Sequence, residues 1–409
     1  MKILLSAVAC DPYRGSEAHF GWMALKALAA RHDIWVLGHA KDGESMERAR
    51  TEGLIGSNVH FYPHSSWGWR HNNRLVARIQ NWRDYQIWTQ QVLETARRLE
   101  REVGFDVLHH STLSTWRVPS ELWRLGKKFV WGPIGGAEVF PLRLLGGAGV
   151  APAGFELLRR LQDFLAFRSP GLEKAVRNSA WIFASTPETL ALVRHVAGSA
   201  EKSSLLSAAF FSDSQIRALS RPEGLFPFMR DGTLRLFAGG ELEVRKGLHL
   251  ALHALAEIQK RGIDFRYHVA GHGPELERLK SLSSRLGIAA KVEFSRPLSG
   301  DGYRKKLWET DAYLLPSLRD SAGLTLMEAM LAGCVPVVAD CGGPGLIVDQ
   351  SCGAKVAVGC EGKMVDALVQ ALLNLVLDKN RAAAMGTLAF ARIAKRFTES
   401  TFLLQVESA

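Results

Sequence analysis

The stretch DAYLLPSLRDSAGLTLMEAMLAGCVPVVADCGGPG, residues 311–345, most constrains the fold that this chain can adopt. Tyr313–Leu315 is a short apolar run that stops at Pro316, as expected of a buried parallel strand that ends in a loop. Apolar residues then recur at helical spacing until Gly333, and a second apolar run covers Val335–Ala339. The stretch therefore predicts a strand, an acidic loop, a helix, a second strand and a glycine-rich turn.

Two carboxylates of this stretch, Asp320 and Glu328, are eight residues apart, which predicts Asp320 at the helix entrance and Glu328 two turns inside. If both were helical they would share one face about 12 Å apart, so one ligand could bridge them. Ligands of open α/β sheets bind outside the carboxyl ends of the strands, where this loop is expected. The plainer alternative is an acid that favours the helix dipole, followed by an exposed glutamate.

The same stretch resembles the signature of the GT-B glycosyltransferases of family 4, in which E-x7-E precedes a helix, a PVV strand and a glycine-rich turn. Here the signature stands as Asp320-x7-Glu328, then AMLAGCVPVVA, then Gly342, Gly343 and Gly345. The resemblance implies an α/β chain with the GT-B fold, in which two Rossmann-like domains with parallel sheets face a cleft. It also implies a transferase that retains anomeric configuration. Asp320 is one methylene shorter than the usual Glu, which leaves the donor sugar open.

The resemblance assigns a donor site to the second domain. The first acid and the backbone beside it would hold the donor sugar, and Glu328 would hold the ribose, because carboxylates accept hydroxyl hydrogen bonds well. Lys246 and Arg245 would bind the diphosphate and offset its growing charge, although Glu241 stands where the family usually has arginine. The predicted donor-binding residues are Arg245, Lys246, Gly271, Arg296, Asp320, Ser321, Ala322, Gly323, Leu324 and Glu328.

The segment DVLHHSTLSTWR places His109 and His110 at the end of a predicted strand. Adjacent strand residues point to opposite faces, so regular geometry allows at most one of them to enter a site there. Family 4 enzymes commonly have a histidine near the donor sugar at this place. Both positions stay open, with His110 favoured after a small register shift. The predicted catalytic residues are His110, His109, Asp320 and Lys246.

Two glycine-containing loops follow other predicted strands. Gly15, in the loop DPYRGSE between a first strand and a helix, has a layout that suits phosphate binding, although a G-x-G-x-x-G pattern is absent. Gly135 and Gly136 follow a strand near residues 129–131. The resemblance directs these loops toward the donor phosphate or the acceptor. A plain turn that needs a positive φ is the alternative for Gly15.

The length of 409 residues predicts two domains, because one ordinary core does not grow this large. Weak periodicity around Pro222 sets an acceptor-binding domain at 1–215, a nucleotide-sugar-binding domain at 216–390, and a last helix at 391–409 that can cross back to the first domain. No apolar run is long enough to span a bilayer, and the start lacks a signal-peptide pattern. We therefore expect a cytoplasmic protein.

Lys and Arg exceed Asp and Glu by ten, which predicts an anionic partner. No zinc-finger, RRM or KH pattern indicates nucleic acid, so anionic lipid at the cytoplasmic membrane face is the better candidate. Seven tryptophans between Trp67 and Trp131, interleaved with arginines, favour an interface or acceptor surface, with core packing as the alternative. Residues 155–168 alternate as an amphipathic helix that either docks on a membrane or covers the protein surface.

We expect transfer of a sugar from a UDP-sugar or GDP-sugar to a hydroxyl of a glycan or lipid-linked saccharide, in bacterial exopolysaccharide or lipopolysaccharide synthesis. No cofactor is expected, and no DxD pattern or His/Cys cluster indicates a metal. A hydrolase with paired acids is disfavoured, because Asp320 and Glu328 suit a ligand held along its length. Two alternatives remain: a GT-B nucleotide-sugar epimerase, and a non-catalytic binding homologue in which Asp320 and Glu241 have disabled transfer.

Overall fold

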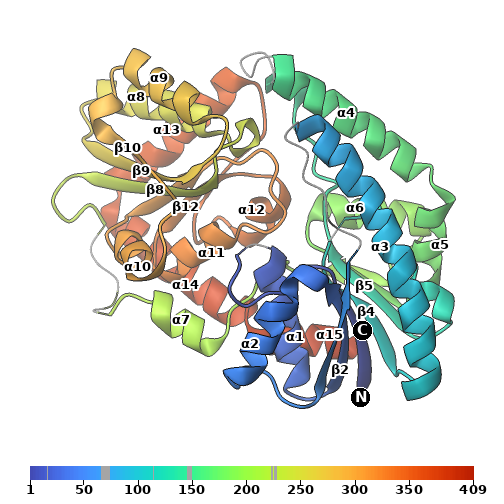
Figure 1. The fold of residues 1–409 in the computed structure, drawn as a ribbon. Helices are drawn as coiled ribbons and strands as arrows, with labels where there is room; N and C mark the ends of the chain where they lie inside the picture. Colours follow the sequence, from blue (N-terminus) through green and yellow to red (C-terminus); the bar gives the residue numbers. More distant parts are fainter. Residues whose placement is uncertain (16, 66–73, 114, 145–149, 223, 225–227) are drawn as a thin grey trace. The chain divides into compact units, whose positions relative to one another are not determined.

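The computed structural model describes residues 1–15, 17–65, 74–113, 115–144, 150–222, 224 and 228–409. These residues form two compact units, each built on a parallel sheet with helices against it (Figure 1). Unit 1 comprises Met1–Ala137, Phe155–Phe210 and Glu399–Ala409. Unit 2 comprises Glu138–Gly154 and Phe211–Thr398.

Within the described residues, the sheet of unit 1 has seven parallel strands in the order β3-β2-β1-β4-β5-β6-β7. The order reverses beside β1, as in doubly wound folds. The strands are β1 (Lys2–Ala7), β2 (Asp33–His39), β3 (Val59–His64), β4 (Val107–His110), β5 (Phe129–Ile134), β6 (Trp181–Ala184) and β7 (Ser203–Leu205). The helices are α1 (Glu17–Ala29), α2 (Gly43–Thr51), α3 (Arg74–Val103), α4 (Val150–Phe167), α5 (Pro170–Asn178), α6 (Pro187–Ala197) and α15 (Glu399–Ser408).

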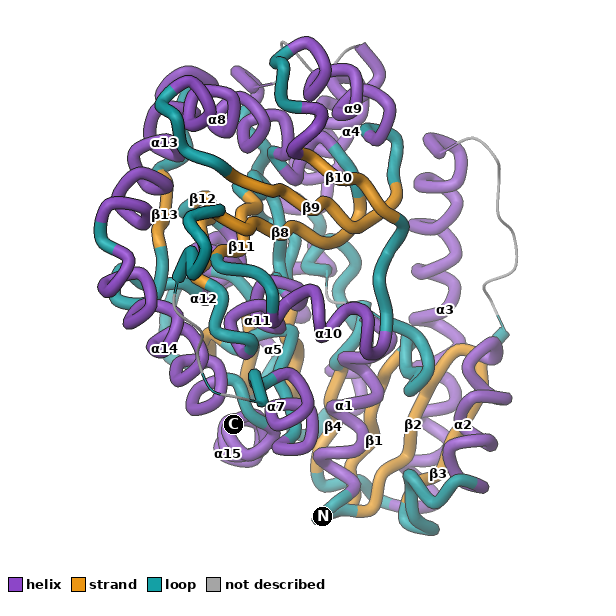
Figure 2. The backbone as a smooth tube through the Cα atoms, turned by 90° about the vertical axis from the view of Figure 1, so that its left-hand side faces the viewer, coloured by secondary structure: helices purple, strands orange, loops and turns teal. Residues whose placement is uncertain are grey.

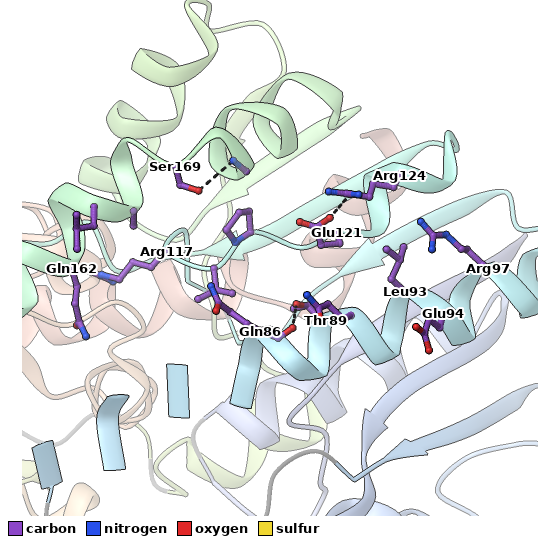
Figure 3. Close-up of a pocket in the computed structure, with 16 residues that line it drawn as sticks. Gln86, Thr89, Leu93, Glu94, Arg97, Arg117, Glu121, Arg124, Gln162 and Ser169 are labelled. Atoms are coloured by element: carbon purple, nitrogen blue, oxygen red, sulfur yellow. Dashed lines mark hydrogen bonds and ion pairs between the residues drawn. The ribbon is translucent and has the colours of Figure 1, made fainter. Parts of the chain in front are cut away.

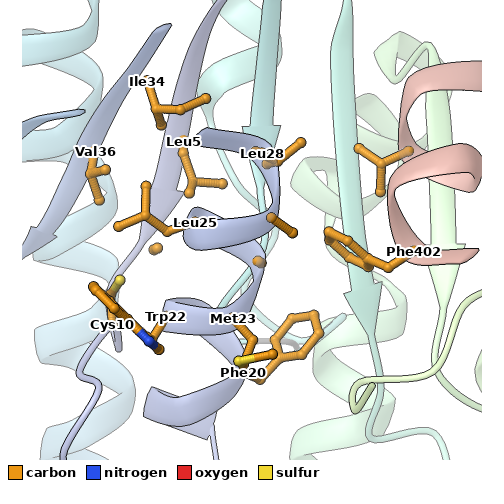
Figure 4. Packing of buried hydrophobic residues seen from close by; sticks show 14 of the residues in the cluster. Leu5, Cys10, Phe20, Trp22, Met23, Leu25, Leu28, Ile34, Val36 and Phe402 are labelled. Carbon is orange, nitrogen blue, oxygen red and sulfur yellow. The ribbon is translucent and has the colours of Figure 1, made fainter. Parts of the chain in front are cut away.

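The last helix, α15, packs into the core of unit 1 although it is almost 400 residues from β1. Phe402 stacks on Phe210 at 4.4 Å between ring centroids. It also meets Phe20 of α1 edge-on, with 6.2 Å between ring centroids. Figure 4 shows Phe20 and Phe402 in this core. Glu407 accepts hydrogen bonds from Arg31 at 3.1 Å and from His32 at 3.0 Å. The buried apolar contacts and these two hydrogen bonds together hold the C-terminal helix against α1.

Unit 2 holds a six-stranded parallel sheet in its described part, in the order β10-β9-β8-β11-β12-β13 (Figure 2). The strands are β8 (Leu234–Glu241), β9 (Phe265–His272), β10 (Val292–Ser295), β11 (Ala312–Leu315), β12 (Val335–Ala339) and β13 (Ala354–Val356). The helices are α7 (Asp213–Leu219), α8 (Leu248–Lys260), α9 (Leu276–Arg285), α10 (Gly300–Trp308), α11 (Leu324–Leu331), α12 (Gly342–Ile347), α13 (Glu361–Leu377) and α14 (Lys379–Arg396).

Residues 311–345 form the centre of unit 2. Strands β11 and β12 are fully buried and pair in parallel, as expected of apolar runs with helices on both faces. Helix α11 between them buries Leu326, Met327, Ala329, Met330 and Leu331. The predicted strand, helix and second strand are confirmed here, with Gly333 at φ +76° after the helix.

Candidate active site

Three loops that carry predicted donor residues lie side by side at one edge of the unit 2 sheet. All its strands are parallel, so their carboxyl ends share that edge. Arg245 and Lys246 follow β8, Asp320 follows β11, and the turn at Gly342 follows β12. Because β8, β11 and β12 are consecutive neighbours in the sheet, their loops meet.

Glycine is required where these loops touch. Gly342 has φ +57°, and a Cβ there would lie 2.4 Å from the Asp320 carbonyl oxygen. The amide of Gly343 donates to the same oxygen at 2.8 Å. Gly247, at φ +67°, would bring a Cβ within 2.2 Å of the Pro316 oxygen. Any side chain at these positions would push the loops apart.

Lys246 and Asp320 form a largely buried ion pair between two of these loops. The Lys246 Nζ lies 2.5 Å from Asp320 Oδ2, and the two side chains are 12% and 16% exposed. The Gly323 amide donates to the other carboxylate oxygen at 3.4 Å. Burial alone would raise the pKa of Asp320, but the charge of Lys246 and its hydrogen bond hold the pKa below its usual value. The Asp320 carboxyl is therefore ionised at neutral pH.

Arg245 is surrounded by acidic groups of its own loop. Its guanidinium bonds Glu243, lies 3.6 Å from Glu241 and donates to the Arg319 carbonyl at 3.2 Å. Glu241, which replaces an arginine of the resemblance, thus partly compensates the neighbouring arginine. Because two acids lie beside the Arg245 guanidinium, Lys246 is the stronger candidate for binding a diphosphate.

Glu328 lies on α11, one turn beyond the helix start at Leu324, and not two turns inside as the spacing predicted. The difference arises because Gly323, at φ +62°, caps the helix and leaves Asp320 in the loop. The Tyr303 hydroxyl donates to Glu328 Oε2 at 2.6 Å. Burial raises the pKa of Glu328 to about 7, although this hydrogen bond opposes the rise.

The charges of Asp320 and Glu328 both affect the pKa of one buried phenol, the side chain of Tyr313. Burial raises the pKa of Tyr313, and the charges of Asp320 and Glu328 raise it further. Its hydroxyl shares a hydrogen bond of 2.8 Å with Thr325, which donates to the Gly239 carbonyl at 3.2 Å. This network ties the start of α11 to the end of β8.

The other predicted donor residues divide into two groups. Ser321, Ala322 and Gly323 follow Asp320 in the loop into α11, and Leu324 is the first residue of that helix. Gly271 ends β9, where a Cβ would come within 2.0 Å of the Gly240 oxygen, so the strand ends approach closely. Arg296 is exposed beyond β10, the edge strand, and the structure does not join it to Lys246 or Asp320.

Two site residues escaped the sequence analysis. Tyr303 reaches Glu328 from α10, 25 residues earlier in the chain. Glu138, two residues after Gly136, is 2% exposed and lies against Gly342, a contact that the sequence did not predict. Neither contact leaves a local spacing signal, because each depends on how distant segments pack.

The two histidines of unit 1 are buried and point to opposite faces of β4, as strand geometry predicted. His109 Nε2 lies 2.8 Å from the Gly132 oxygen, whereas His110 bonds Ser6 at 2.9 Å and the Tyr85 hydroxyl at 3.0 Å. Each residue is 1% exposed. Burial lowers the pKa of His109 to about 4 and of His110 to about 3, so both are neutral at pH 7. Their catalytic role stays a prediction.

The predicted glycines of unit 1 lie in different surroundings. Gly15 has open space at its Cβ position. Gly135 is buried in an isolated bridge to Thr115. The Gly136 carbonyl accepts hydrogen bonds from Arg117 at 2.6 Å and from Arg159 at 2.9 Å. Arginine side chains therefore hold Gly136 in place. For Gly15 the structure confirms only that the residue lies in a loop.

A pocket of about 820 Å³ opens in unit 1 between α3, the loop after β4 and the end of α4 (Figure 3). Figure 3 shows Gln86 and Thr89 of α3 on one side and Gln162 of α4 on the other, with Arg117 between them. Amide, hydroxyl and guanidinium groups line it together with apolar side chains such as Leu93 and Leu165. Such groups suit a ligand rich in hydroxyls.

The tryptophan-rich region does not form an interface where it can be described. Trp88, Trp116 and Trp131 are among the largest fully buried side chains and pack in the core beside α3 and α5. The interface interpretation is wrong for these three, because their rings fill the space between sheet and helices. Trp67 and Trp69, together with the neighbouring Arg70, lie outside the described residues.

Two structural features are absent from the described residues. No group of three or more His, Cys, Asp or Glu side chains is placed to hold a metal ion there. In the same part of the chain, no helix has both the length and the apolar character needed to cross a membrane.

The two parallel-sheet α/β units define the GT-B fold, which solved glycosyltransferases share. The structure of Anabaena HepE in complex with UDP and glucose matches with a TM-score of 0.61 and 17% identity, over 100% of this chain and 98% of that one. WaaG, a glycosyltransferase involved in lipopolysaccharide biosynthesis, matches with a TM-score of 0.61 and 15% identity, over 99% and 98%. At these identities the likeness establishes the fold alone.

Residues 230–392 match the family model described as Glycosyl transferases group 1, so unit 2 carries such a domain. A relative from Mycolicibacterium smegmatis, the GDP-mannose-dependent alpha-(1-6)-phosphatidylinositol monomannoside mannosyltransferase, is 34% identical over 151 residues. The match spans 35% of this chain and 38% of the relative.

Proposed function

We propose that this chain is a retaining glycosyltransferase of family 4, which moves a sugar from a UDP-sugar or GDP-sugar to a hydroxyl of a glycan or lipid-linked saccharide. The observation that carries the proposal is the Lys246–Asp320 pair, held by glycine-dependent loops at the carboxyl edge of the unit 2 sheet. Support comes from the group 1 domain at residues 230–392.

Each side chain of the site has a task in this proposal. The Lys246 ammonium has three donors, of which Asp320 takes one, so the others can bind a diphosphate and offset the charge of the leaving group. Asp320 and the amides of the following loop hold the donor sugar. Glu328, when ionised, accepts the ribose hydroxyls. The reaction then needs no bound cofactor.

The acceptor is assigned to unit 1. The pocket beside α3 presents amides and hydroxyls that suit a saccharide, and Arg117 links it to Gly136, one of the predicted acceptor positions. We place the acceptor in cell-surface polysaccharide or lipopolysaccharide synthesis on the cytoplasmic side. The name of the mycobacterial relative, a phosphatidylinositol monomannoside mannosyltransferase, supports a lipid-linked acceptor.

The test is sugar transfer by the purified full chain. UDP-sugars and GDP-sugars are incubated with candidate saccharide acceptors, and nucleotide release and product anomericity are measured by NMR. We expect acceptor-dependent release that Lys246→Ala lowers by at least about 100-fold, as for loss of a transition-state charge partner. Lys379→Ala, at an exposed position of α14, is the matched control and should retain full activity.

Other outcomes of this assay reject the proposal. Sugar conversion without an acceptor would identify an epimerase. Nucleotide binding without turnover would identify a binding homologue, which the acids around Arg245 would then explain.

A further inference from the structure

Helix α4 presents its apolar face outward. Leu157, Leu161, Phe164, Leu165 and Phe167 are 58%, 54%, 50%, 60% and 42% exposed. We call these five residues the α4 stripe. An ordinary surface helix does the reverse, because its apolar face covers the core. The sequence pattern predicted an amphipathic helix, but it could not tell which face points inward.

The inward face of α4 is held by polar contacts, so the helix is fixed in this orientation. Asp163 bonds Arg117, whose side chain is 11% exposed. Arg159 donates to the Gly136 carbonyl at 2.9 Å, and Glu156 is 8% exposed. Turning the helix to bury the α4 stripe would break the Asp163–Arg117 ion pair. It would also separate the buried polar groups from the α4 side chains that they bond.

Two arginines lie beside the α4 stripe. Arg160 lies three residues after Leu157 and four before Phe164, so helical spacing places it beside the α4 stripe. The Arg168 guanidinium lies 4.1 Å from the centroid of the Phe164 ring. Both acids of the helix, Glu156 and Asp163, face inward. An apolar stripe flanked by arginines matches helices that lie in a membrane interface.

We propose that the α4 stripe docks this protein on an anionic lipid bilayer. The apolar side chains would enter the acyl boundary, while Arg160 and Arg168 would contact lipid phosphates. A second copy of the chain fits less well, because two such faces would bring four arginines close together. Leu165 of the α4 stripe also lines the pocket proposed for the acceptor, so docking is tested by a measurement that needs no turnover.

The experiment is vesicle flotation of the full chain with phosphatidylcholine vesicles, with and without 30% phosphatidylglycerol. The wild type should float with the anionic vesicles. Leu161→Gln/Leu165→Gln should lower the partition coefficient roughly tenfold or more. Arg160→Gln/Arg168→Gln should lower it on the order of fivefold per arginine and weaken its salt dependence. Leu377→Gln, at a leucine that is 81% exposed on α13, is the matched control and should float as the wild type does.

The melting temperature of each variant is measured as a separate check of folding. It should not fall, because the replaced leucines are exposed. Absence of wild-type flotation, or equal flotation of Leu161→Gln/Leu165→Gln, overturns the proposal. So does a concentration-dependent dimer in light scattering that this variant abolishes, which would assign the α4 stripe to a second copy.

Discussion

Units 1 and 2 bury ionisable side chains in opposite charge states near the ends of their strands. In unit 1, His109 and His110 are buried among neutral partners, and burial keeps both uncharged. In unit 2, Asp320 is buried against Lys246, and this opposite charge keeps the carboxylate ionised. Burial beside an opposite charge thus preserves the ionised form of a side chain, whereas burial among neutral partners favours its neutral form.

The largest effect is expected from breaking the buried ion pair. Lys246→Ala should lower the free energy of unfolding by about 2 to 4 kcal/mol, because it leaves the Asp320 carboxylate without its cation. Asp320→Asn in the Lys246→Ala background should recover part of this loss, without recovering nucleotide binding. Urea unfolding measures both.

A matched control is the exposed pair of Lys280 and Glu277, 2.9 Å apart with side chains 47% and 80% exposed. Lys280→Ala should change stability very little. Equal effects of Lys246→Ala and Lys280→Ala would show that burial does not distinguish the two pairs.

The second effect concerns Glu328, whose folded pKa of about 7 exceeds the usual 4.5. The folded form holds this proton more tightly, so the stabilisation is complete below about pH 4.5 and is lost as pH rises through 7. Glu328→Gln should therefore raise the melting temperature relative to the wild type at pH 8 but not at pH 4.5. The same variant should lose nucleotide affinity by tenfold or more.

Nucleotide binding should show the matching pH dependence. If the ionised carboxylate accepts the ribose hydroxyls, affinity should fall roughly tenfold per pH unit below 7. Isothermal titration with Glu328→Gln separates this effect from the titration of the phosphates, because its profile should be flatter. Parallel profiles for the two proteins would remove Glu328 from the site.

The third effect is the opposite pH response of unit 1. The pKa of His110 is about 3 when folded, against 6.5 for an ordinary histidine, so its stabilisation is complete above 6.5 and is lost as pH falls toward 3. His110→Gln should reduce the pH slope of the unfolding free energy by up to about 1.4 kcal/mol per unit between pH 6 and 4.

His110→Gln also distinguishes the structural role from the predicted catalytic one. A variant that stays folded at pH 7.5 and retains turnover identifies a structural histidine. Retained nucleotide binding with lost turnover would support catalysis, and would require the His110 contacts to Ser6 and Tyr85 to rearrange.

The smallest effect is expected from Tyr303→Phe, which removes one hydrogen bond of 2.6 Å to Glu328. The loss of stability should be about 1 kcal/mol. Because this bond lowers the pKa of Glu328, the pH midpoint of nucleotide binding should move upward. An unchanged midpoint would mean that Tyr303 does not govern the charge of Glu328.

Local patterns in the sequence predicted much of the fold. The apolar run Val335–Ala339 matches β12, and Tyr313–Leu315 lies within β11, because buried parallel strands are continuous apolar runs. The helix start at Leu324 was less predictable, since it depends on the φ of Gly323. These positions differ because apolar runs are encoded locally, whereas a helix cap depends on backbone geometry.

Contacts between distant residues were beyond the sequence. Lys246 and Asp320 were both predicted as site residues, but their ion pair joins positions 74 residues apart. The outward direction of the α4 stripe depends on Arg117, which holds Asp163 from another segment. Residue types and spacing thus identified candidate groups, while packing determined their partners, charges and exposure.

The most direct test of the donor site is isothermal titration of UDP and GDP into the wild type, Lys246→Ala and Glu328→Gln, with Glu201→Gln as an exposed control. The account predicts that one nucleotide binds the wild type and the control equally, and that both site variants weaken it by tenfold or more. Binding that all four proteins share, or binding by none of them while all are folded, would contradict a nucleotide site at Lys246, Asp320 and Glu328.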